Sequence, residues 1–560
     1  MNNDASGKRF LSGVTALTLS TVLVKVIGLV YKIPMMHYLG AEGMGYFNAA
    51  YELYTLFFVV ATAGLPVAVS ILISESLAHG RLRNVKKIYR ISFALFFGLG
   101  LVGALIMSLC AAPLAHAVGS SDARLCITMI APTVFFVAVA SAVRGYFQGN
   151  QNMVPTAASQ VIEALGKLIL GLALAVWATR SGWPPAKAAA LAVVGLVAGS
   201  AISMLYLLIS QTRRRLAVDA FSTDLSTDSA KSILSGLLML AVPVTVSASL
   251  SGLARVVDMT LILRRLSDIG FDPSVAAAMF GSYSTMVVPI CHLPSSLIAG
   301  VSVSLVPGLT DAVESGCRER EEHLIGIAMR LCALVAVPCA LGMSIFSRPI
   351  LSLLFSGQTE PIELSAPLLS VLGLSVVSTC LMNVTNSVLQ AHRKAALPIF
   401  SMLVGMVVKV VSAYILIGIP EVAMMGAPVS TLLCNVVAVG MNFGFMQKCD
   451  AYSGGLLSIF GKPLGASCVA MLAAIAVYLP LCSRLPLSAA FLAAVAVCGM
   501  VYVVASVKVG ALAPEDVAML PFGSRFEKWL KTKENNITVN QKKGKSNGKQ
   551  TDDMRAASKG

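Results

Sequence analysis

Long apolar runs, separated by short polar segments, follow one another along almost the whole chain. A bilayer core ~30 Å thick is crossed by an α-helix of about 20 apolar residues. The pattern therefore predicts about fourteen membrane-spanning helices. They cover residues 10–36, 46–74, 91–115, 124–147, 157–178, 187–210, 233–263, 276–305, 325–347, 364–390, 397–418, 424–446, 464–482 and 487–508.

The amino-acid composition supports this class. Hydrophobic residues make up 56% and charged residues 12% of the 560 residues, and the mean hydropathy is +0.80. Soluble proteins carry roughly 25% charged residues, so most side chains of this chain are not suited to face water. We predict an all-α polytopic membrane protein.

The charged loops indicate which way the chain faces. The first span follows Lys8 and Arg9 without a small-x-small cleavage site, so we expect a retained helix and not a signal peptide. With the N-terminus inside, the inner loops hold more Lys and Arg than the outer loops, chiefly at 81–90 and 213–215. This distribution predicts that both termini are cytoplasmic.

The formal net charge of +15 does not indicate a nucleic-acid partner. Many lysines lie in the polar segment 522–560, which we expect to be a disordered tail that lies against anionic membrane lipids. No basic-aromatic nucleic-acid module accompanies it.

Motifs of catalysis and metal binding are missing from the sequence. There is no GxSxG, HExxH or P-loop motif, and all of the six His except His292 fall in or near predicted loops. The twelve Cys include no CxxC pair, which disfavours a zinc site or a disulfide framework. We therefore expect no enzymatic activity, no metal and no cofactor.

The segment that begins RGYFQGNQNMVPTAASQ at residue 144 has a partial copy at LQAHRKAALPIFSMLVGMVVKVV, residues 389–411. Gln148, Ser159 and Lys167 match Gln390, Ser401 and Lys409, each 242 positions later. Chance similarity between apolar helices is the alternative. A true repeat would shift the chain by six helices, and an even shift predicts a parallel repeat about an axis along the membrane normal.

Such a repeat divides the chain into two parallel six-helix lobes and two C-terminal helices. The N-lobe would be 1–210, the C-lobe 233–447, the cytoplasmic linker 211–232 and the last two helices 464–508, before the tail. In proteins of this plan the solute lies between the lobes, and rocking of the lobes gives alternating access.

Ionisable side chains inside the predicted spans are the candidate site. Each costs ~2.5–3.5 kcal/mol at the bilayer centre, so it normally faces a cavity or a partner. The cationic ones are Lys25, Lys32, Arg144, Lys167, Arg255 and Lys409, and the acidic ones are Glu52, Glu163 and Asp258. This surplus of positive charge favours an anionic solute, above all a phosphate or pyrophosphate. Lys25 has no acidic neighbour three or four residues away, so it is the strongest candidate to line a cavity.

Several of these side chains also have a purely structural interpretation. Glu163 and Lys167 can form an ion pair within their helix, and Arg255 and Asp258 can form a structural pair. Arg144 can mark the cytoplasmic border of its span, and Lys32 can snorkel toward the membrane surface. The polar segment 145–156 is expected to be a cytoplasmic turn. Its Gly145, Gly149 and Pro155 are candidate residues of a gate hinge that lets the helices on either side move.

Three stretches together resemble one family. They are LGAEGMGYFNAAYELY (39–54), ATAGLPVAVSILISES (61–76) and RGYFQGNQNMVPTAASQVIE (144–163). They look like the stage V sporulation protein B branch of the polysaccharide-biosynthesis membrane proteins, which is related to lipid II flippases and O-antigen flippases. Multidrug and toxin extruders are more distant relatives. The resemblance covers roughly residues 10–505.

The resemblance implies a fourteen-helix flippase without enzymatic chemistry. Its substrate would be an undecaprenyl-pyrophosphate-linked cell-wall precursor, lipid II or a related glycan, moved from the inner to the outer leaflet. Membrane lipids would be partners, and cell-wall synthesis proteins are candidate partners. In the family pattern, Lys25 of VKVIGLVYK fits a basic residue of the first helix and Lys32 a second one, shifted by one position. Helix 2 carries Glu52 where lipid II flippases have a cation, and Asp258 alone resembles a sodium-site residue.

Two other functions remain open. A cation-coupled multidrug extruder of the same superfold would use Glu52, Glu163 or Asp258 to carry the ion, and Lys25 would be dispensable. A scaffold for a wall-synthesis complex would tolerate charge changes in the cavity but not changes in its loops.

Overall fold

The computed structural model describes residues 3–218, 227–449 and 456–511, which are helices joined by short turns and contain no strand. Thirteen helical segments in this part of the chain are long and apolar enough to cross a membrane. The first, Leu19–Ala78, covers two of the predicted spans, and each of the others coincides with one. The predicted all-α polytopic membrane fold is confirmed.

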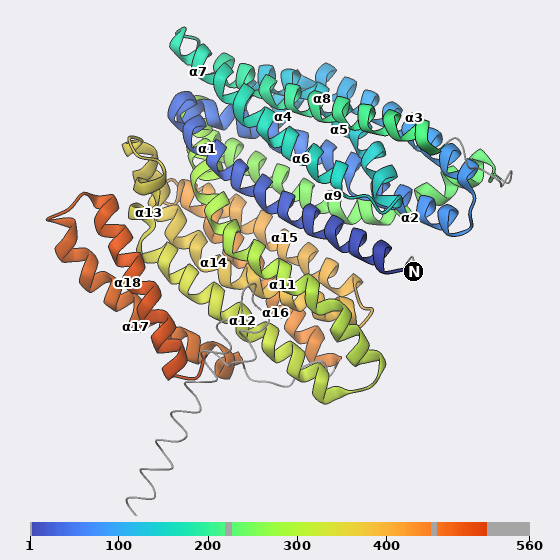
Figure 1. Ribbon diagram of the computed structural model, residues 1–560. Helices are drawn as coiled ribbons and strands as arrows, with labels where there is room; N and C mark the ends of the chain where they lie inside the picture. The colour runs from blue at the N-terminus through green and yellow to red at the C-terminus, as the bar shows by residue number, and fades with distance from the viewer. Residues whose placement is uncertain (1–2, 219–226, 450–455, 512–560) are drawn as a thin grey trace, which may run out of the picture. The chain divides into compact units, whose positions relative to one another are not determined.

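The N-terminal helices are drawn in blue in Figure 1. Helix α1 runs over Asn3–Thr62 but bends at Gly40, whose φ of 68° and ψ of 179° are not helical. Glycine adopts positive φ without steric cost, so this residue separates the two spans that the sequence predicts. Next come α2 (Leu65–Ala78), α3 (Leu82–Leu109), α4 (Ala111–Ala117) and a 3-10 turn η1 (Ser121–Ala123).

The helices that follow include a π-helical segment. They are α5 (Arg124–Gly149), α6 (Val154–Gly166), the π-helix η2 (Lys167–Gly171), α7 (Leu172–Arg180) and α8 (Pro185–Val218). The sequence predicts a single span here between residues 157 and 178, and α6, η2 and α7 together form it.

The rest of the chain contains a second π-helix. The elements are α9 (Ala230–Asp268), α10 (Pro273–Ser282), the π-helix η3 (Tyr283–Val287), α11 (Val288–Glu314), α12 (Arg318–Ile345), α13 (Ser347–Leu354), α14 (Thr359–Ala391), α15 (Ala396–Ile417), a 3-10 turn η4 (Ala423–Met425), α16 (Gly426–Lys448), α17 (Leu456–Cys482) and α18 (Leu487–Lys508).

The chain forms two compact units, each assembled from several segments. The first contains residues 1–292, 346–372 and 399–438, and the second contains 293–345, 373–398 and 439–560. The predicted boundaries of two lobes at 1–210 and 233–447 stay a prediction. Part of the predicted linker and the whole predicted tail 522–560 lie outside the described residues.

Helix α5 lies in the interior of the first unit. It packs against α1, α2, α3 and α8. Of the residues in the most apolar 18-residue stretch of its span, 72% are buried. In the second unit, α12 packs against α17, and α17 and α18 lie side by side (Figure 1).

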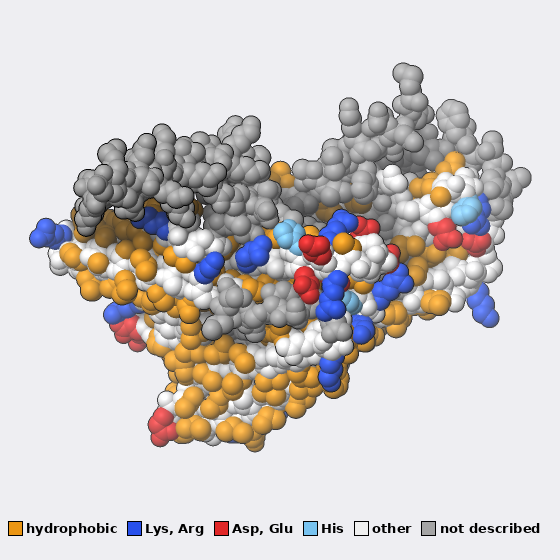
Figure 2. Space-filling view, turned by 90° about the horizontal axis from the view of Figure 1, so that it is seen from below, with side chains coloured by type: hydrophobic (Ala, Val, Ile, Leu, Met, Phe, Trp, Pro, Cys, Tyr) orange, Lys and Arg blue, Asp and Glu red, His pale blue; other side chains and the backbone are white. Residues whose placement is uncertain are grey.

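Hydrophobic side chains cover wide stretches of the face drawn in Figure 2, and these stretches carry no Lys, Arg, Asp or Glu. Such apolar outer surfaces suit contact with lipid.

Helix α8 approaches α6 and η2 through glycines. A Cβ at Gly166 would lie 2.5 Å from the Cα of Gly199, and a Cβ at Gly195 would overlap the backbone of Gly171. Small residues let transmembrane helices pack backbone to backbone. The contact fixes the start of η2, and with it Lys167, against α8.

Candidate functional site

Two π-helical segments of the first unit carry polar contacts of predicted site residues. The first segment, η2, begins at Lys167. In the second, η3, the carbonyl oxygen of Ser284 accepts a hydrogen bond of 2.9 Å from Lys32 Nζ on α1. A π-helical turn is wider than an α-helical one and often marks a functional position. Asn48 of α1, which is buried, donates to the hydroxyls of Ser284 and Thr285 at 2.9 and 2.7 Å.

Lys167 lies over aromatic rings. Its Nζ is 5.0 Å from the ring centroid of Tyr31 and 4.6 Å from that of Tyr51, both on α1. Tyr51 also stacks on Phe47, with 6.2 Å between centroids and 11° between planes. Electron-rich ring faces attract a cation without neutralising its charge. The predicted pair with Glu163 is therefore replaced by a cation–π contact with α1.

Glu163 instead pairs with Arg144. The distance from Arg144 Nη2 to Glu163 Oε2 is 2.9 Å. Arg144 also donates to the hydroxyls of Ser159 at 3.0 Å and Ser203 at 3.3 Å, and it is only 8% exposed. These contacts tie α5, α6 and α8 together inside the unit. The interpretation of Arg144 as a residue of the cytoplasmic border stays a prediction.

Helix α9 carries two ion pairs to other helices. Arg255 Nε lies 3.1 Å from Glu52 Oε2 on α1. Asp258 Oδ2 lies 3.0 Å from Lys409 Nζ on α15, and both side chains are largely buried. The predicted pair of Arg255 with Asp258 is therefore replaced by two pairs between helices. Because Arg255 and Asp258 lie three positions apart on one helix, the sequence predicted a contact between them, but each forms its ion pair with a residue of another helix.

Lys25 lies on α1 with its side chain exposed. Among the described residues it forms neither a hydrogen bond nor an ion pair.

Sequence reasoning identified the charged residues but missed the groups around them. Tyr31, Tyr51 and Ser284 were absent from the predicted site, because aromatic and hydroxyl residues are common in apolar helices. The one available signal was spacing, since Tyr31 adjoins Lys32 and Tyr51 adjoins Glu52. His292 was visible as the only histidine placed inside a predicted span.

The three predicted hinge residues lie in or beside regular helix. Gly145 and Gly149 belong to the last two turns of α5, and Pro155 is in the first turn of α6, where proline fits. A Cβ at Gly145 would lie 2.9 Å from the Pro66 carbonyl oxygen, and one at Gly149 would lie 2.7 Å from Ile73 Cβ. These glycines allow α5 to pack closely on α2. Their role as a gate hinge stays a prediction.

Together these features define a multi-pass, all-helical membrane protein that holds ionisable side chains within its helices. The fold is shared with a solved structure, that of the lipid II flippase MurJ in its inward closed conformation. The match has a TM-score of 0.65 and 15% identity, and covers 88% of this chain and 97% of that one.

The sequence also has relatives in Bacillus subtilis (strain 168). The chain is 25% identical to the lipid II flippase MurJ over 461 residues, which cover 80% of this chain and 84% of that protein. It is 26% identical to stage V sporulation protein B over 444 residues, or 78% and 84%. The model of the polysaccharide biosynthesis protein family matches residues 10–313, and the chain belongs to that family. A second family model, MatE, matches residues 282–415.

Proposed function

We propose that this protein is a flippase that moves an undecaprenyl-pyrophosphate-linked cell-wall precursor from the inner to the outer leaflet by alternating access. The precursor would be lipid II or a related glycan. The relatives named as a lipid II flippase and a sporulation protein support this assignment. The protein would lie in the bacterial plasma membrane with both termini cytoplasmic, and would work beside the enzymes of wall synthesis.

The observation that carries the proposal is the division of the six predicted cations into two groups. Arg144, Arg255 and Lys409 each form an ion pair with a carboxylate. Lys25, Lys32 and Lys167 form no ion pair among the described residues. We call these three the lysine set. Their charges are available to an anion, and ammonium groups bind phosphate oxygens through charge-assisted hydrogen bonds.

In this proposal each lysine has a distinct part. Lys25 is exposed and would make the first contact with the pyrophosphate. Lys32 is oriented by the Ser284 carbonyl at 2.9 Å, and Lys167 is oriented by the rings of Tyr31 and Tyr51. Neither interaction uses a negative charge, so both ammonium groups keep their affinity for the anion. The polyprenyl tail would stay among apolar helix surfaces.

The second candidate is a cation-coupled extruder, which the MatE match to residues 282–415 favours. It requires Glu52, Glu163 or Asp258 to bind and release a proton or a metal cation. All three carboxylates are paired with basic side chains, so each cycle would have to break an ion pair. For this reason we favour the flippase.

The test is the leaflet location of lipid II in cells depleted of their own flippase and supplied with this protein. We expect the wild type to restore lipid II in the outer leaflet. Lys25→Ala, Lys32→Ala and Lys167→Ala should each lose this activity at normal protein level. Lys187→Ala is the matched control, because it removes the same charge from an exposed side chain in the first turn of α8.

Either of two results would change the proposal. If the wild type leaves lipid II in the inner leaflet, the substrate is a different undecaprenyl-linked glycan or the protein is an extruder. If the wild type restores transport and the three lysine variants do so equally well, the lysine set is not the anion site.

A further inference from the structure

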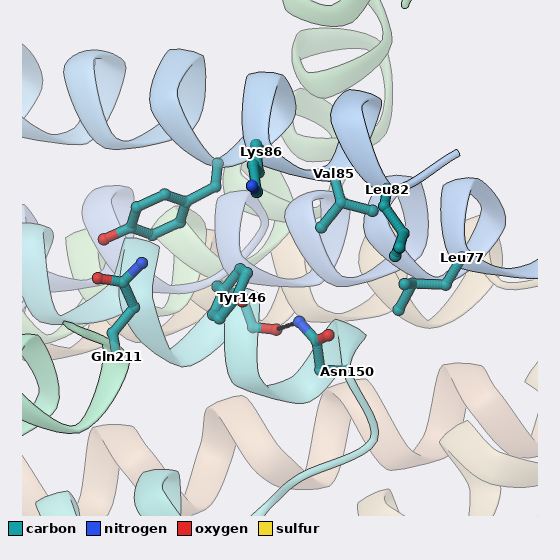
Figure 3. Close-up of a pocket in the computed structure, with 8 residues that line it drawn as sticks. Leu77, Leu82, Val85, Lys86, Tyr146, Asn150 and Gln211 are labelled. Carbon is teal, nitrogen blue, oxygen red and sulfur yellow. Dashed lines mark hydrogen bonds between the residues drawn. The ribbon is translucent and has the colours of Figure 1, made fainter. Parts of the chain in front are cut away.

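Two polar groups of the first unit are left unpaired by the helix that carries them, and they differ in what can satisfy them. The first is Gln211 Nε2, which has no hydrogen-bond partner among the described residues and lies at a pocket beside the last turn of α5 (Figure 3). This pocket holds only groups of the size of water, and one water molecule is enough for a single donor. The second is a backbone carbonyl of η3, which a charged side chain satisfies.

This carbonyl belongs to Ser284, and the hydrogen bonding of η3 leaves it without a backbone donor. In an α-helix the N–H of Val288, four residues later, would bond to it. In η3 that N–H donates instead to the carbonyl oxygen of Tyr283, five residues back, as in a π-helical turn. The next residue is Pro289, which has no N–H. The helix itself therefore offers the Ser284 carbonyl no donor.

Lys32 supplies the missing hydrogen bond from α1. Its Nζ donates to the Ser284 carbonyl oxygen at 2.9 Å. An unsatisfied carbonyl is costly inside a membrane, and carbonyls freed by a proline are normally satisfied by a neighbouring helix or side chain. The contact therefore depends on Pro289 as well as on Lys32, although the two residues lie on different helices.

Two features hold η3 in place against α1. The helices α1 and α10 meet backbone to backbone just before it, since a Cβ at Gly45 would lie 2.0 Å from the carbonyl oxygen of Ala277. Asn48, about one turn further along α1, donates to the hydroxyls of Ser284 and Thr285 at 2.9 and 2.7 Å. The Asn48 side chain is buried, so water does not compete for these bonds. Asn48 thus fixes the turn that carries the free carbonyl.

We propose that Pro289 and Asn48 are positioning residues of the anion site. Pro289 keeps the Ser284 carbonyl free to accept from Lys32, and Asn48 fixes the turn. An ammonium group has three donors, so Lys32 can keep this hydrogen bond and still offer two to pyrophosphate oxygens. A side chain that is already held in place loses less entropy when the anion binds. The inference rests on the proposed function, because it takes Lys32 to contact a pyrophosphate.

The experiment compares full-length wild type, Pro289→Ala, Lys32→Ala and the double variant, each purified in detergent. Alanine at position 289 restores an N–H, so the Ser284 carbonyl gains a backbone donor whether the turn stays π-helical or becomes α-helical. The four proteins form a double-mutant cycle, in which a proline that acts only on its own helix has the same effect with and without Lys32.

Affinity is measured with undecaprenyl pyrophosphate as the probe. We expect Pro289→Ala to weaken binding roughly tenfold, the effect of losing one hydrogen bond that involves a charged group. It should have no further effect once Lys32 is alanine. Asn48→Leu, which is similar in volume, should weaken binding likewise. Pro294→Ala removes another proline of α11, and as the matched control it should bind like the wild type.

Thermal unfolding of the same proteins without the probe tests the contact itself. Lys32→Ala leaves the Ser284 carbonyl unsatisfied and should lower the melting temperature. It should do so much less when Pro289 is alanine, because the carbonyl then has a backbone donor.

Additive changes in melting temperature would overturn the proposal. So would an equal loss of affinity from Pro289→Ala with and without Lys32. Failure of the wild type to bind the probe would instead contradict the proposed function, and the melting temperatures would still decide whether Pro289 governs the contact of Lys32.

Discussion

Lys409 of α15 and Asp258 of α9 form an ion pair in which Nζ lies 3.0 Å from Oδ2. The side chains are 19% and 18% exposed, and the other oxygen of Asp258 has no partner among the described residues. The pair neutralises Lys409 and fixes α15 against α9. This contact separates Lys409 from the lysine set, although the sequence placed them together.

Breaking this ion pair should destabilise the protein. Lys409→Ala leaves the Asp258 carboxylate buried and uncompensated, and should lower the free energy of unfolding by about 3 kcal/mol or more. Asp258→Asn should be similarly harmful, and the double variant less harmful than the sum of the two. A double-mutant cycle of thermal unfolding in detergent measures this coupling. The exposed pair of Arg348 and Glu363, at 2.9 Å, is the control and should contribute about 0–1 kcal/mol.

Arg144 should behave as a residue of the folded core and not of the substrate site. Arg144→Leu leaves Glu163 without its partner and removes the bonds to Ser159 and Ser203. We expect a fall in the amount of folded protein in the membrane, measured by size-exclusion chromatography of a fluorescent fusion. Transport per folded molecule should change little. Normal protein level with lost transport would instead indicate direct contact with the substrate.

The ring under Lys167 can be tested without changing a charge. Tyr51→Phe keeps the aromatic face at 4.6 Å from Nζ, so transport should stay near the wild-type level. Tyr51→Leu removes the face, and the loss of a cation–π contact worth about 0.5–2 kcal/mol should free the ammonium group. We expect transport to fall several-fold in the leucine variant. Equal activity of the two variants would show that the ring does not orient Lys167.

Gly145 and Gly149 allow two predictions to be compared. The hinge hypothesis expects that alanine at both positions slows transport at an unchanged protein level. The close contacts with Pro66 and Ile73 predict a stability loss of about 1–3 kcal/mol from overpacking. Thermal unfolding decides between them. Gly98→Ala on α3 is the control, because its added Cβ meets no atom within 4 Å.

The sequence was sufficient to predict the membrane helices, because each needs a long apolar run whatever surrounds it. It was sufficient to find the charged residues, since charge is rare in such runs. It could not predict their partners. Glu163 has Lys167 one turn away, yet Arg144 on α5 holds it at 2.9 Å. Spacing rules describe pairs of side chains within one helix, whereas the packing of several helices determines which side chain pairs with Glu163.

The π-helices were also beyond prediction. Neither KLILG at 167–171 nor YSTMV at 283–287 has a composition that departs from its neighbours. The wide turns arise from the way each span packs, and one of them supplies the carbonyl that orients Lys32. Gly40 is the contrary case, because a glycine between two apolar runs is itself a sign of a bend.

The glycine contact between α8 and the span formed by α6, η2 and α7 limits how the sequence can change. Gly195 and Gly171 meet through their backbones, and Gly166 and Gly199 do so one turn further along. Backbone atoms have no rotamers, so an added methyl group at Gly166, Gly195 or Gly199 cannot be absorbed by the backbone that it would meet. A compensating substitution on the facing helix is therefore also ruled out. Random mutagenesis should recover these three positions unchanged among functional clones, while the lipid-facing residues beside them vary freely.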